Sequence, residues 1–227
     1  MIKIENVDVF GWEAAIRGMR APMNSWDKSD SRYEIDETSI VEFRIGENDL
    51  KLMKTLSKAG SDHAKFLRMI NVTLDITAPL YWWKEYDTYK VGTVANSCST
   101  MHTIHKKLFT LDDFSHEDLI TSKSKHGGSL DVLVAVIGEL NHCREAYIRA
   151  REKGVDADIA NSYWHQMIQL LPSSYNQKRT VQLNYQVLKS MYFARRNHKL
   201  NEWRDLCDWM LTLPYFKEIC VDVVENS

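Results

Sequence analysis

Apolar and polar residues alternate along three short stretches of the chain. The alternation is most regular over residues 70–77, as expected for a strand with one buried face. Residues 2–10 and 40–45 show the same period of two, the former with a one-residue slip that is typical of a β-bulge. Pro79 then ends the ladder that begins at residue 70. We therefore expect three strands in the first third of the chain.

A spacing of three and four residues between apolar positions dominates the rest of the chain. It predicts helices over residues 12–19 and 49–59, and a long amphipathic helix over 130–148. Asp156 can cap a further helix that continues to Leu170. Together with the three strands, these helices predict an α+β fold in which a small antiparallel or mixed sheet packs with a predominantly helical C-terminal half.

Residues 181–198 also have helical spacing, and this segment carries polar and charged groups on one face. Asn184, Arg195 and His198 lie on one stripe of that predicted helix, together with two apolar residues. Burial of an unpaired guanidinium or amide is costly, so a buried stripe would need partners for these groups. Either a bound anionic ligand or a carboxylate of the protein can supply them, and the spacing leaves both open.

The composition is that of an ordinary globular protein. The chain has 227 residues, 44% of them hydrophobic and 26% charged, and we expect a single domain over residues 1–227. A formal net charge of −2 gives no basic field, which argues against nucleic acid as a partner. No stretch approaches the ~20 apolar residues of a membrane span, and the N-terminus lacks the apolar core of a signal peptide. We expect a cytoplasmic protein with no membrane partner.

The cysteine and histidine spacings predict neither a disulfide framework nor a metal site. The four cysteines contain no Cys-x-x-Cys pair, and we expect them to be reduced. His102 and His105 have the spacing of a ligand pair, but no further ligand stands at helical spacing beside them, so no metal is expected. Cys98 precedes His102 by one helical turn, yet the segment lacks a clear helical pattern, which disfavours a nucleophile and base pair.

The stretch after the strand at 70–77 is a candidate binding site. Five aromatic residues between Tyr81 and Tyr89 are followed by the run Asn96-Ser97-Cys98-Ser99-Thr100, in which four of the five side chains are polar. A small polar loop between aromatic segments leaves space and hydrogen-bonding groups for a ligand. A solvated turn has the same composition, so the pattern alone leaves both interpretations open.

The order of these features resembles the signature region of the flavin-dependent thymidylate synthases. That family's motif reads Arg-His-Arg-x-x-Ser-x-Asn-Glu-x-Ser-x-Arg-Tyr and follows a strand that ends in Ala-Pro. Here Ala78-Pro79 matches the Ala-Pro, Asn96 matches the Asn, and Ser99 matches the second Ser. Ser97 stands in place of the Glu and Met101 in place of the last Arg. The frame of the motif is kept, whereas several of its side chains differ.

The second half of the chain follows the order of the same family. Leu171-Pro172, Tyr175, Asn184 and Arg195 occur in the family's order, with its intervals from Pro to Asn and from Asn to Arg. The resemblance implies that Arg195 is the catalytic residue, which holds and polarises the pyrimidine. It also implies two sets of binding residues: Asn96, Ser97, Ser99, Lys178 and Arg195 for the nucleotide substrate, and Lys90, Asn184 and His198 for the flavin cofactor.

The resemblance implies a flavin-dependent methyltransferase of the thymidylate synthase type. Such an enzyme uses FAD, with methylenetetrahydrofolate and NADPH as co-substrates, for reductive one-carbon transfer to the pyrimidine of dUMP, or of a related pyrimidine nucleotide, in dTMP biosynthesis. The family assembles as a homotetramer, which is the assembly implied here. The replacements at Ser97 and Met101 leave an alternative, a catalytically altered or inactive homologue that binds a nucleotide or a flavin or serves as an assembly protein.

Overall fold

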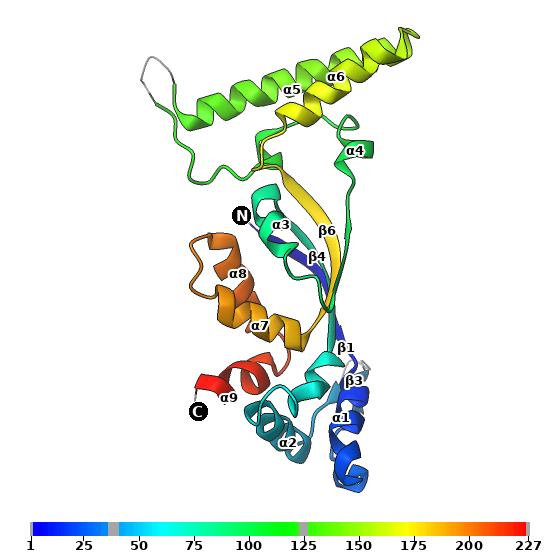
Figure 1. Ribbon diagram of the computed structural model, residues 1–227, viewed down its shortest axis with the longest axis vertical. Helices are drawn as coiled ribbons and strands as arrows, with labels where there is room; N and C mark the ends of the chain where they lie inside the picture. Colours follow the sequence, from blue (N-terminus) through cyan, green and yellow to red (C-terminus); the bar gives the residue numbers. More distant parts are fainter. Residues whose placement is uncertain (1, 36–40, 123–126, 226–227) are drawn as a thin grey trace. The chain divides into compact units, whose positions relative to one another are not determined.

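The structure is a computed structural model that describes residues 2–35, 41–122 and 127–225 (Figure 1). Its contacts divide the chain into two compact units. That the whole chain forms a single domain over residues 1–227 stays a prediction. The first unit comprises Met1–Lys3, Ile76–Thr88 and Asn96–Arg179, and the second unit comprises Ile4–Asp75, Tyr89–Ala95 and Thr180–Ser227.

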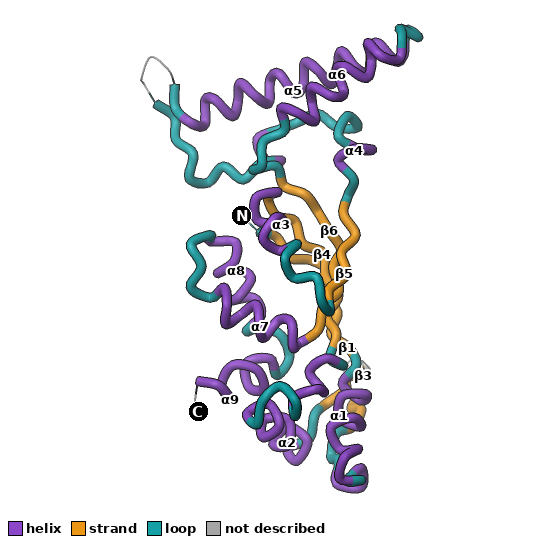
Figure 2. The backbone as a smooth tube through the Cα atoms, viewed as in Figure 1, coloured by secondary structure: helices purple, strands orange, loops and turns teal. Residues whose placement is uncertain are grey.

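Four strands form one sheet in the order β1-β4-β6-β5 (Figure 2), and the boundary between the two units falls within each of them. Every second residue of β4 is buried from Val72 to Ala78, which confirms the strand predicted over residues 70–77. The combination of this small sheet with many helices confirms the predicted α+β fold. The strands are β1 (Lys3–Phe10), β4 (Asn71–Pro79), β5 (Thr93–Ser97) and β6 (Asn176–Asn184).

The first unit contains a long helical hairpin. Its two helices, α5 (Ser129–Glu152) and α6 (Ala157–Leu170), run side by side (Figure 1) and confirm the two helices predicted there. The Asp156 carboxylate caps α6 by accepting a hydrogen bond from the Asp158 N–H at 2.8 Å, as its position predicted. Two short helices, α3 (Leu80–Tyr86) and α4 (Thr100–Thr103), precede the hairpin. One buried hydrophobic cluster of this unit is formed by Ile104, Phe109, Phe114, Leu133, Ile137, Leu140, Cys143 and Met167.

The second unit packs helices around a core of its own, in which Trp203, Tyr185 and Phe216 are fully buried. Helices α1 and α2 confirm those predicted over residues 12–19 and 49–59. The strand predicted at 40–45 is present as β3, which pairs antiparallel with β2; residue 40 lies outside the described residues. The elements are α1 (Trp12–Arg20), β2 (Arg32–Ile35), β3 (Val41–Arg44), α2 (Glu47–Lys58), α7 (Tyr185–Arg195), α8 (Asn201–Met210) and α9 (Asp222–Glu225).

The helix predicted over residues 181–198 was wrong at both ends. Its first part belongs to β6, in which Val181 and Leu183 are buried while Gln182 between them is exposed. This is a strand period of two, which the helical spacing of the residues after it masked. Asn184 is the N-cap of α7, because its Oδ1 accepts a hydrogen bond from the Val187 N–H at 3.1 Å. His198 follows the end of α7, so the predicted polar stripe does not lie on one helix.

Alanine substitutions at two glycines should change the free energy of unfolding in opposite directions. At Gly11, which has φ +95° and precedes α1, a Cβ would lie 2.1 Å from the Met69 carbonyl oxygen. Gly11→Ala should therefore lower the free energy of unfolding by about 2 kcal/mol or more, since strain and a backbone clash add. At Gly138, within α5, a Cβ meets nothing within 4 Å. Gly138→Ala should stabilise by about 0.5–1 kcal/mol because alanine has the higher helix propensity. Urea denaturation measures both, and a neutral Gly11→Ala would contradict the close contact with Met69.

Candidate functional site

Arg195, the predicted catalytic residue, is the last residue of α7 and is held by aromatic side chains of the second unit. Its Nε donates a hydrogen bond to the Tyr89 hydroxyl at 3.1 Å. Its guanidinium carbon lies 4.7 Å from the centre of the Trp203 ring and 5.7 Å from that of Tyr89. Cation–π contacts of this kind fix the plane of a guanidinium. Arg195 is therefore a positioned and permanent cation.

His198 lies close to the same aromatic ring. Its imidazole is 6.4 Å from the Trp203 ring, centre to centre, in an edge-on arrangement. Its Nδ1 accepts a hydrogen bond from the Leu200 N–H at 3.2 Å, so the neutral ring carries its proton on Nε2. The structure thus brings two of the predicted residues, Arg195 and His198, together around Trp203.

The other predicted flavin-binding residues, Lys90 and Asn184, also belong to the second unit. Lys90 is exposed and directly follows Tyr89 in sequence. Asn184 uses its carbonyl oxygen to cap α7, which orients its amide nitrogen. The backbone at Gly92 approaches that nitrogen closely: a Cβ there would lie 3.1 Å from Asn184 Nδ2, and the φ of +75° favours glycine. The chain from Lys90 to Gly92 and the start of α7 therefore lie against each other.

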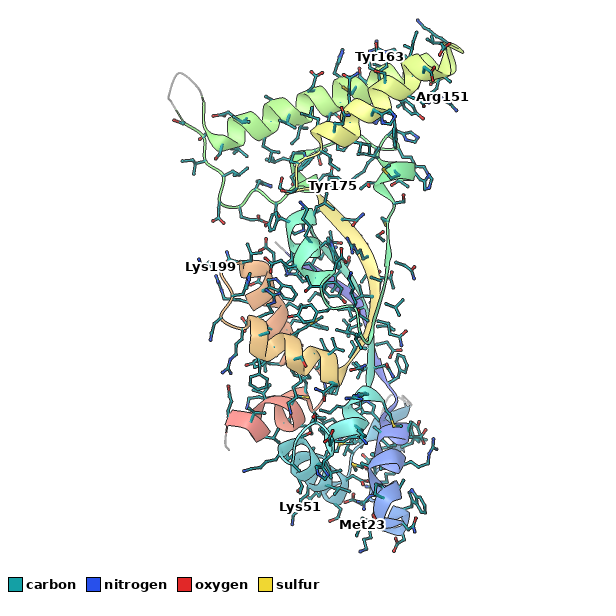
Figure 3. All side chains as sticks on the ribbon, viewed as in Figure 1. Met23, Lys51, Arg151, Tyr163, Tyr175 and Lys199 are labelled. Atoms are coloured by element: carbon teal, nitrogen blue, oxygen red, sulfur yellow. The ribbon has the colours of Figure 1, made fainter. Side chains whose placement is uncertain are left out.

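The first unit contains a separate cavity of about 440 Å³ between α4, the segment after it, and the beginning of β6. Tyr175, labelled in Figure 3, precedes β6 and forms part of its wall. Burial raises the pKa of the Tyr175 phenol, so its hydroxyl stays a neutral donor. Other lining residues are Cys98, Thr100, Lys106, Phe109, Asn176 and Lys178.

The cavity presents more than one ammonium group. Lys107 pairs with Asp113, and this hydrogen bond raises the pKa of Lys107. Asp113 also accepts a hydrogen bond from the Thr110 N–H at 2.9 Å, so its carboxylate has partners from both Lys107 and the backbone. Lys106 and Lys178 line the same cavity together with Asp112, so among its described lining residues three lysines face two aspartates. Aromatic walls with ammonium groups suit a planar, anionic ligand.

The polar run at residues 96–100 is a loop only at Cys98 and Ser99, which connect β5 to α4. Asn96 and Ser97 are exposed residues of β5, and Ser99 is the N-cap of α4, whose Oγ accepts a hydrogen bond from the His102 N–H at 3.3 Å. β5 is tied to β6 because the Cys98 N–H donates to the Lys178 carbonyl at 2.9 Å. Of the predicted nucleotide-binding residues of the first unit, Lys178 lines the cavity, whereas Asn96, Ser97 and Ser99 are not among the residues of its wall.

Sequence reasoning missed the groups that hold the predicted residues. Tyr89 and Trp203 gave no periodic signal that would pair them with Arg195, because Tyr89 is 106 residues away along the chain. Lys106 and Tyr175 were likewise not predicted as neighbours of Lys178. The cluster of basic residues directly after the polar run was the signal that could have pointed to Lys106.

Within residues 2–35, 41–122 and 127–225, no helix combines the length and the apolar character needed to cross a bilayer. Among the same residues, no group of three or more His, Cys, Asp or Glu side chains could hold a metal ion. Cys98 is an exposed free thiol, and the other three cysteines are free and buried.

Comparison with known proteins supports the fold class of this chain. No family model and no curated protein sequence matches the chain. Solved structures do match over nearly its whole length, and these share its α+β fold. Thymidylate synthase X (ThyX) from Helicobacter pylori, solved with FAD and dUMP, has a TM-score of 0.64 at 16% identity and covers 99% of this chain and 100% of its own. The UMP/dUMP methylase PolB from Streptomyces cacaoi, bound with 5-Br dUMP, has a TM-score of 0.54 at 17% identity, over 96% of this chain and 91% of its own.

A second structure of the Helicobacter pylori flavin-dependent thymidylate synthase ThyX, complexed with FAD and dUMP, gives a TM-score of 0.63 at 16% identity and covers 97% of this chain and 99% of its own. These TM-scores show a common fold, and at identities of 16–17% the likeness shows the fold alone.

Proposed function

We propose that this chain is a FAD-dependent enzyme of the thymidylate synthase type, which catalyses reductive one-carbon transfer to the pyrimidine of dUMP or a related pyrimidine nucleotide, with dTMP as the product from dUMP. The observation that carries this proposal is the positioned cation at Arg195 on a fold shared end to end with structures that hold FAD and dUMP. The proposed co-substrates are methylenetetrahydrofolate and NADPH. A homotetramer in the cytoplasm is part of the same proposal.

Arg195 has the properties that the proposed reaction requires of a catalytic residue. Addition of hydride to the conjugated ring of a pyrimidine places negative charge on its carbonyl edge, and a guanidinium can donate two parallel hydrogen bonds to that edge. Because Tyr89 and Trp203 fix the plane of Arg195, the donors need little reorganisation when the charge develops. No side chain of the protein has to act as a nucleophile in this scheme.

The residues of the second unit fit a flavin by the chemistry of their donors. The ammonium of Lys90 suits a phosphate or a ring carbonyl, and the amide nitrogen of Asn184 and the Nε2–H of His198 are oriented donors for the carbonyls of the isoalloxazine. We assign these three residues to FAD. FAD supplies hydride chemistry when bound, and the task of the protein is to orient the ring and to exclude water.

The cavity of the first unit supports the assignment of Lys178 to the nucleotide. At Met101, which stands in place of the last arginine of the family's motif, this chain has an apolar side chain. The lysines at 106 and 178 supply positive charge in the cavity instead. We infer that the phosphate of the substrate is held there by ammonium groups, with Asn96, Ser97 and Ser99 as further nucleotide-binding residues.

The direct test is product formation. Purified protein incubated with FAD, NADPH, methylenetetrahydrofolate and dUMP should produce dTMP, detected by chromatography, and omission of FAD or of the folate should abolish the product. UMP as substrate in parallel reactions determines the nucleotide preference. Absence of product from both nucleotides, in a preparation that binds FAD, would overturn the proposed activity and leave an inactive homologue that binds its ligands.

Lys178→Gln should weaken dUMP binding by about ten-fold, because a charge-assisted hydrogen bond contributes about 1.5–3 kcal/mol. Deoxyuridine, which lacks the phosphate, should bind both proteins equally, and titration calorimetry measures each affinity. The matched control is Lys153→Gln, at an exposed lysine after α5, which should leave dUMP affinity unchanged. An equal loss of affinity for deoxyuridine and dUMP would show that Lys178 does not contact the phosphate.

A further inference from the structure

A second concave site lies in the second unit, on the side of α1 that faces the loop before β2. It has a volume of about 380 Å³ and contains none of the residues assigned above to flavin or nucleotide. Met23, labelled in Figure 3, marks the end of the chain segment that follows α1. The residues that line it include Glu13, Ile16, Arg17, Trp26 and Phe43, and we call it the Trp26 cleft.

The floor of the Trp26 cleft is rigid because one buried carboxylate ties it together. Asp49 is fully buried and accepts hydrogen bonds from Arg20 Nε at 2.6 Å, from Ser29 Oγ at 2.7 Å and from Ser31 Oγ at 2.6 Å. The Asp30 carboxylate accepts from the N–H of Asn48 at 2.9 Å, which fixes the loop to the start of α2. The cleft is therefore formed before any ligand arrives.

The walls of the Trp26 cleft include two aromatic residues, Trp26 and Phe43, that are held in place and only partly covered. The indole N–H of Trp26 donates to the Arg17 carbonyl at 3.2 Å, yet 49% of the residue is exposed. Phe43 stacks edge-on against Tyr33 with ring centres 5.0 Å apart. The Tyr33 hydroxyl donates a hydrogen bond to Glu13. A fixed indole with an exposed face offers a stacking surface at a low entropic cost.

The charges of the Trp26 cleft differ in how far they are already used. Arg20 is neutralised by Asp49, whereas Glu13 keeps its negative charge beside the Tyr33 hydroxyl. Arg17 forms no ion pair within the part of the chain that the structure describes, and it is an exposed residue that lines the cleft. The cation with unused hydrogen-bonding capacity is therefore Arg17, next to the open face of Trp26.

We propose that the Trp26 cleft binds a planar aromatic ring that carries an anionic group, with the ring against Trp26 and Phe43 and a carboxylate or phosphate at Arg17. The volume lies within the ~300–1,000 Å³ of small-molecule sites. A carboxylate and a phosphate share the chemistry that Arg17 recognises, and the probes of the experiment distinguish them.

Titration calorimetry with three probes tests this site in the full-length protein. The probes are 2-naphthoate, 2-naphthyl phosphate and the neutral 2-naphthamide. We expect one of the two anions to bind one-to-one with a Kd of about 1 mM or lower and the amide to bind at least about five-fold more weakly. The anion that binds more tightly identifies the charged group of the ligand. No binding of either anion, or equal binding of the amide, would overturn the proposal.

Two variants one helical turn apart on α1 give the sharpest discrimination. Arg17→Gln should weaken binding of the tighter anion about five-fold, and Glu13→Gln should strengthen it about two-fold, because each alters one charge near the same ligand. Arg68→Gln, at an exposed arginine of the same unit outside the cleft, should have no effect. Effects of the same sign at Glu13 and Arg17, or none at Arg17, would contradict the assignment.

Trp26→Ala tests the contact with the ring of the ligand. It should weaken binding of the tighter anion about ten-fold and binding of the amide in the same proportion. Should this variant fail to fold, the opposite effects of the two charge variants still decide the question. Retention of FAD is measured separately on each variant. The cleft holds none of the residues assigned to flavin, so unchanged retention is expected, and a loss of FAD in parallel with the probe would contradict a separate site.

Discussion

Arg195→Ala is expected to lower kcat/KM for dUMP about 10³-fold while the protein stays folded. The reason is that Arg195 is the proposed donor to the negative charge of the reacting pyrimidine, and loss of one such donor costs about 10²–10³ in rate. Loss of the contacts with Trp203 and Tyr89 should lower the free energy of unfolding by only about 1 kcal/mol. Steady-state kinetics and thermal unfolding of the same preparations measure the two effects.

The neighbouring Arg196 provides a matched control. Its guanidinium lies 5.7 Å from the Tyr192 ring and 5.2 Å from the Phe193 ring, and it pairs with Glu225. Arg196→Ala therefore removes a comparable set of structural contacts, but its turnover should remain close to that of the unmodified chain. Equal turnover of the two variants, or collapse of the Arg195→Ala protein, would identify Arg195 as a structural cation.

Asp49→Asn is expected to produce the largest loss of stability, about 3 kcal/mol or more. The Asp49 side chain is fully buried, and its charge is the partner of the guanidinium of Arg20, a residue that is itself only 4% exposed. Removal of one charge from a buried pair leaves the other uncompensated, which costs about 3–5 kcal/mol. The serines at 29 and 31 would lose their charged acceptor as well. Urea denaturation measures the difference.

The same substitution should have a pH signature. Burial acts to raise the pKa of Asp49, but the hydrogen bonds from Ser31, Ser29 and Arg20 and the charge of Arg20 outweigh it, so the pKa is lowered in the folded protein. A lowered folded pKa means that the ionised carboxylate stabilises the fold above its ordinary value of about 4 and that this contribution is lost as the pH falls through the folded pKa. The stability difference between the two proteins should shrink on acidification.

Glu34→Gln is the control for Asp49→Asn. Glu34 also pairs with arginines, Arg32 at 2.6 Å and Arg44 at 3.2 Å, but both partners are largely exposed. Exposed ion pairs contribute about 0–1 kcal/mol, so the loss should be small. A loss at Asp49 no larger than that at Glu34 would contradict the role of Asp49 as the acceptor that anchors the loop before β2 to α2.

The fold was more predictable than the site because local periodicity reports burial and carries no information on distant partners. β4 and α5 have long, regular patterns, and their positions followed from the sequence. β6 has only a short alternation around Val181 and Leu183, directly before a helical spacing, and the stronger signal hid it. Residual error at such a junction is expected where two periods meet.

The candidate site shows the same limit. The order of Asn184 and Arg195 along the chain led to both residues, but the groups that fix Arg195 come from Tyr89 and Trp203. Asp49 was predicted only as the start of a helix, whereas its partners lie 18 to 29 residues earlier. Contacts between segments that are distant along the chain cannot be predicted from local periodicity. For this reason nothing in the sequence indicated the Trp26 cleft.

The central claim, that this fold holds a flavin through residues such as Lys90, Asn184 and His198, is tested most directly by a visible absorption spectrum. The purified protein is mixed with FAD, the excess is removed by gel filtration, and the spectrum is recorded beside that of an Asn184→Ala variant. The account predicts retained flavin bands in the unmodified chain and weaker retention in the variant. A colourless protein after addition and removal of FAD would contradict it.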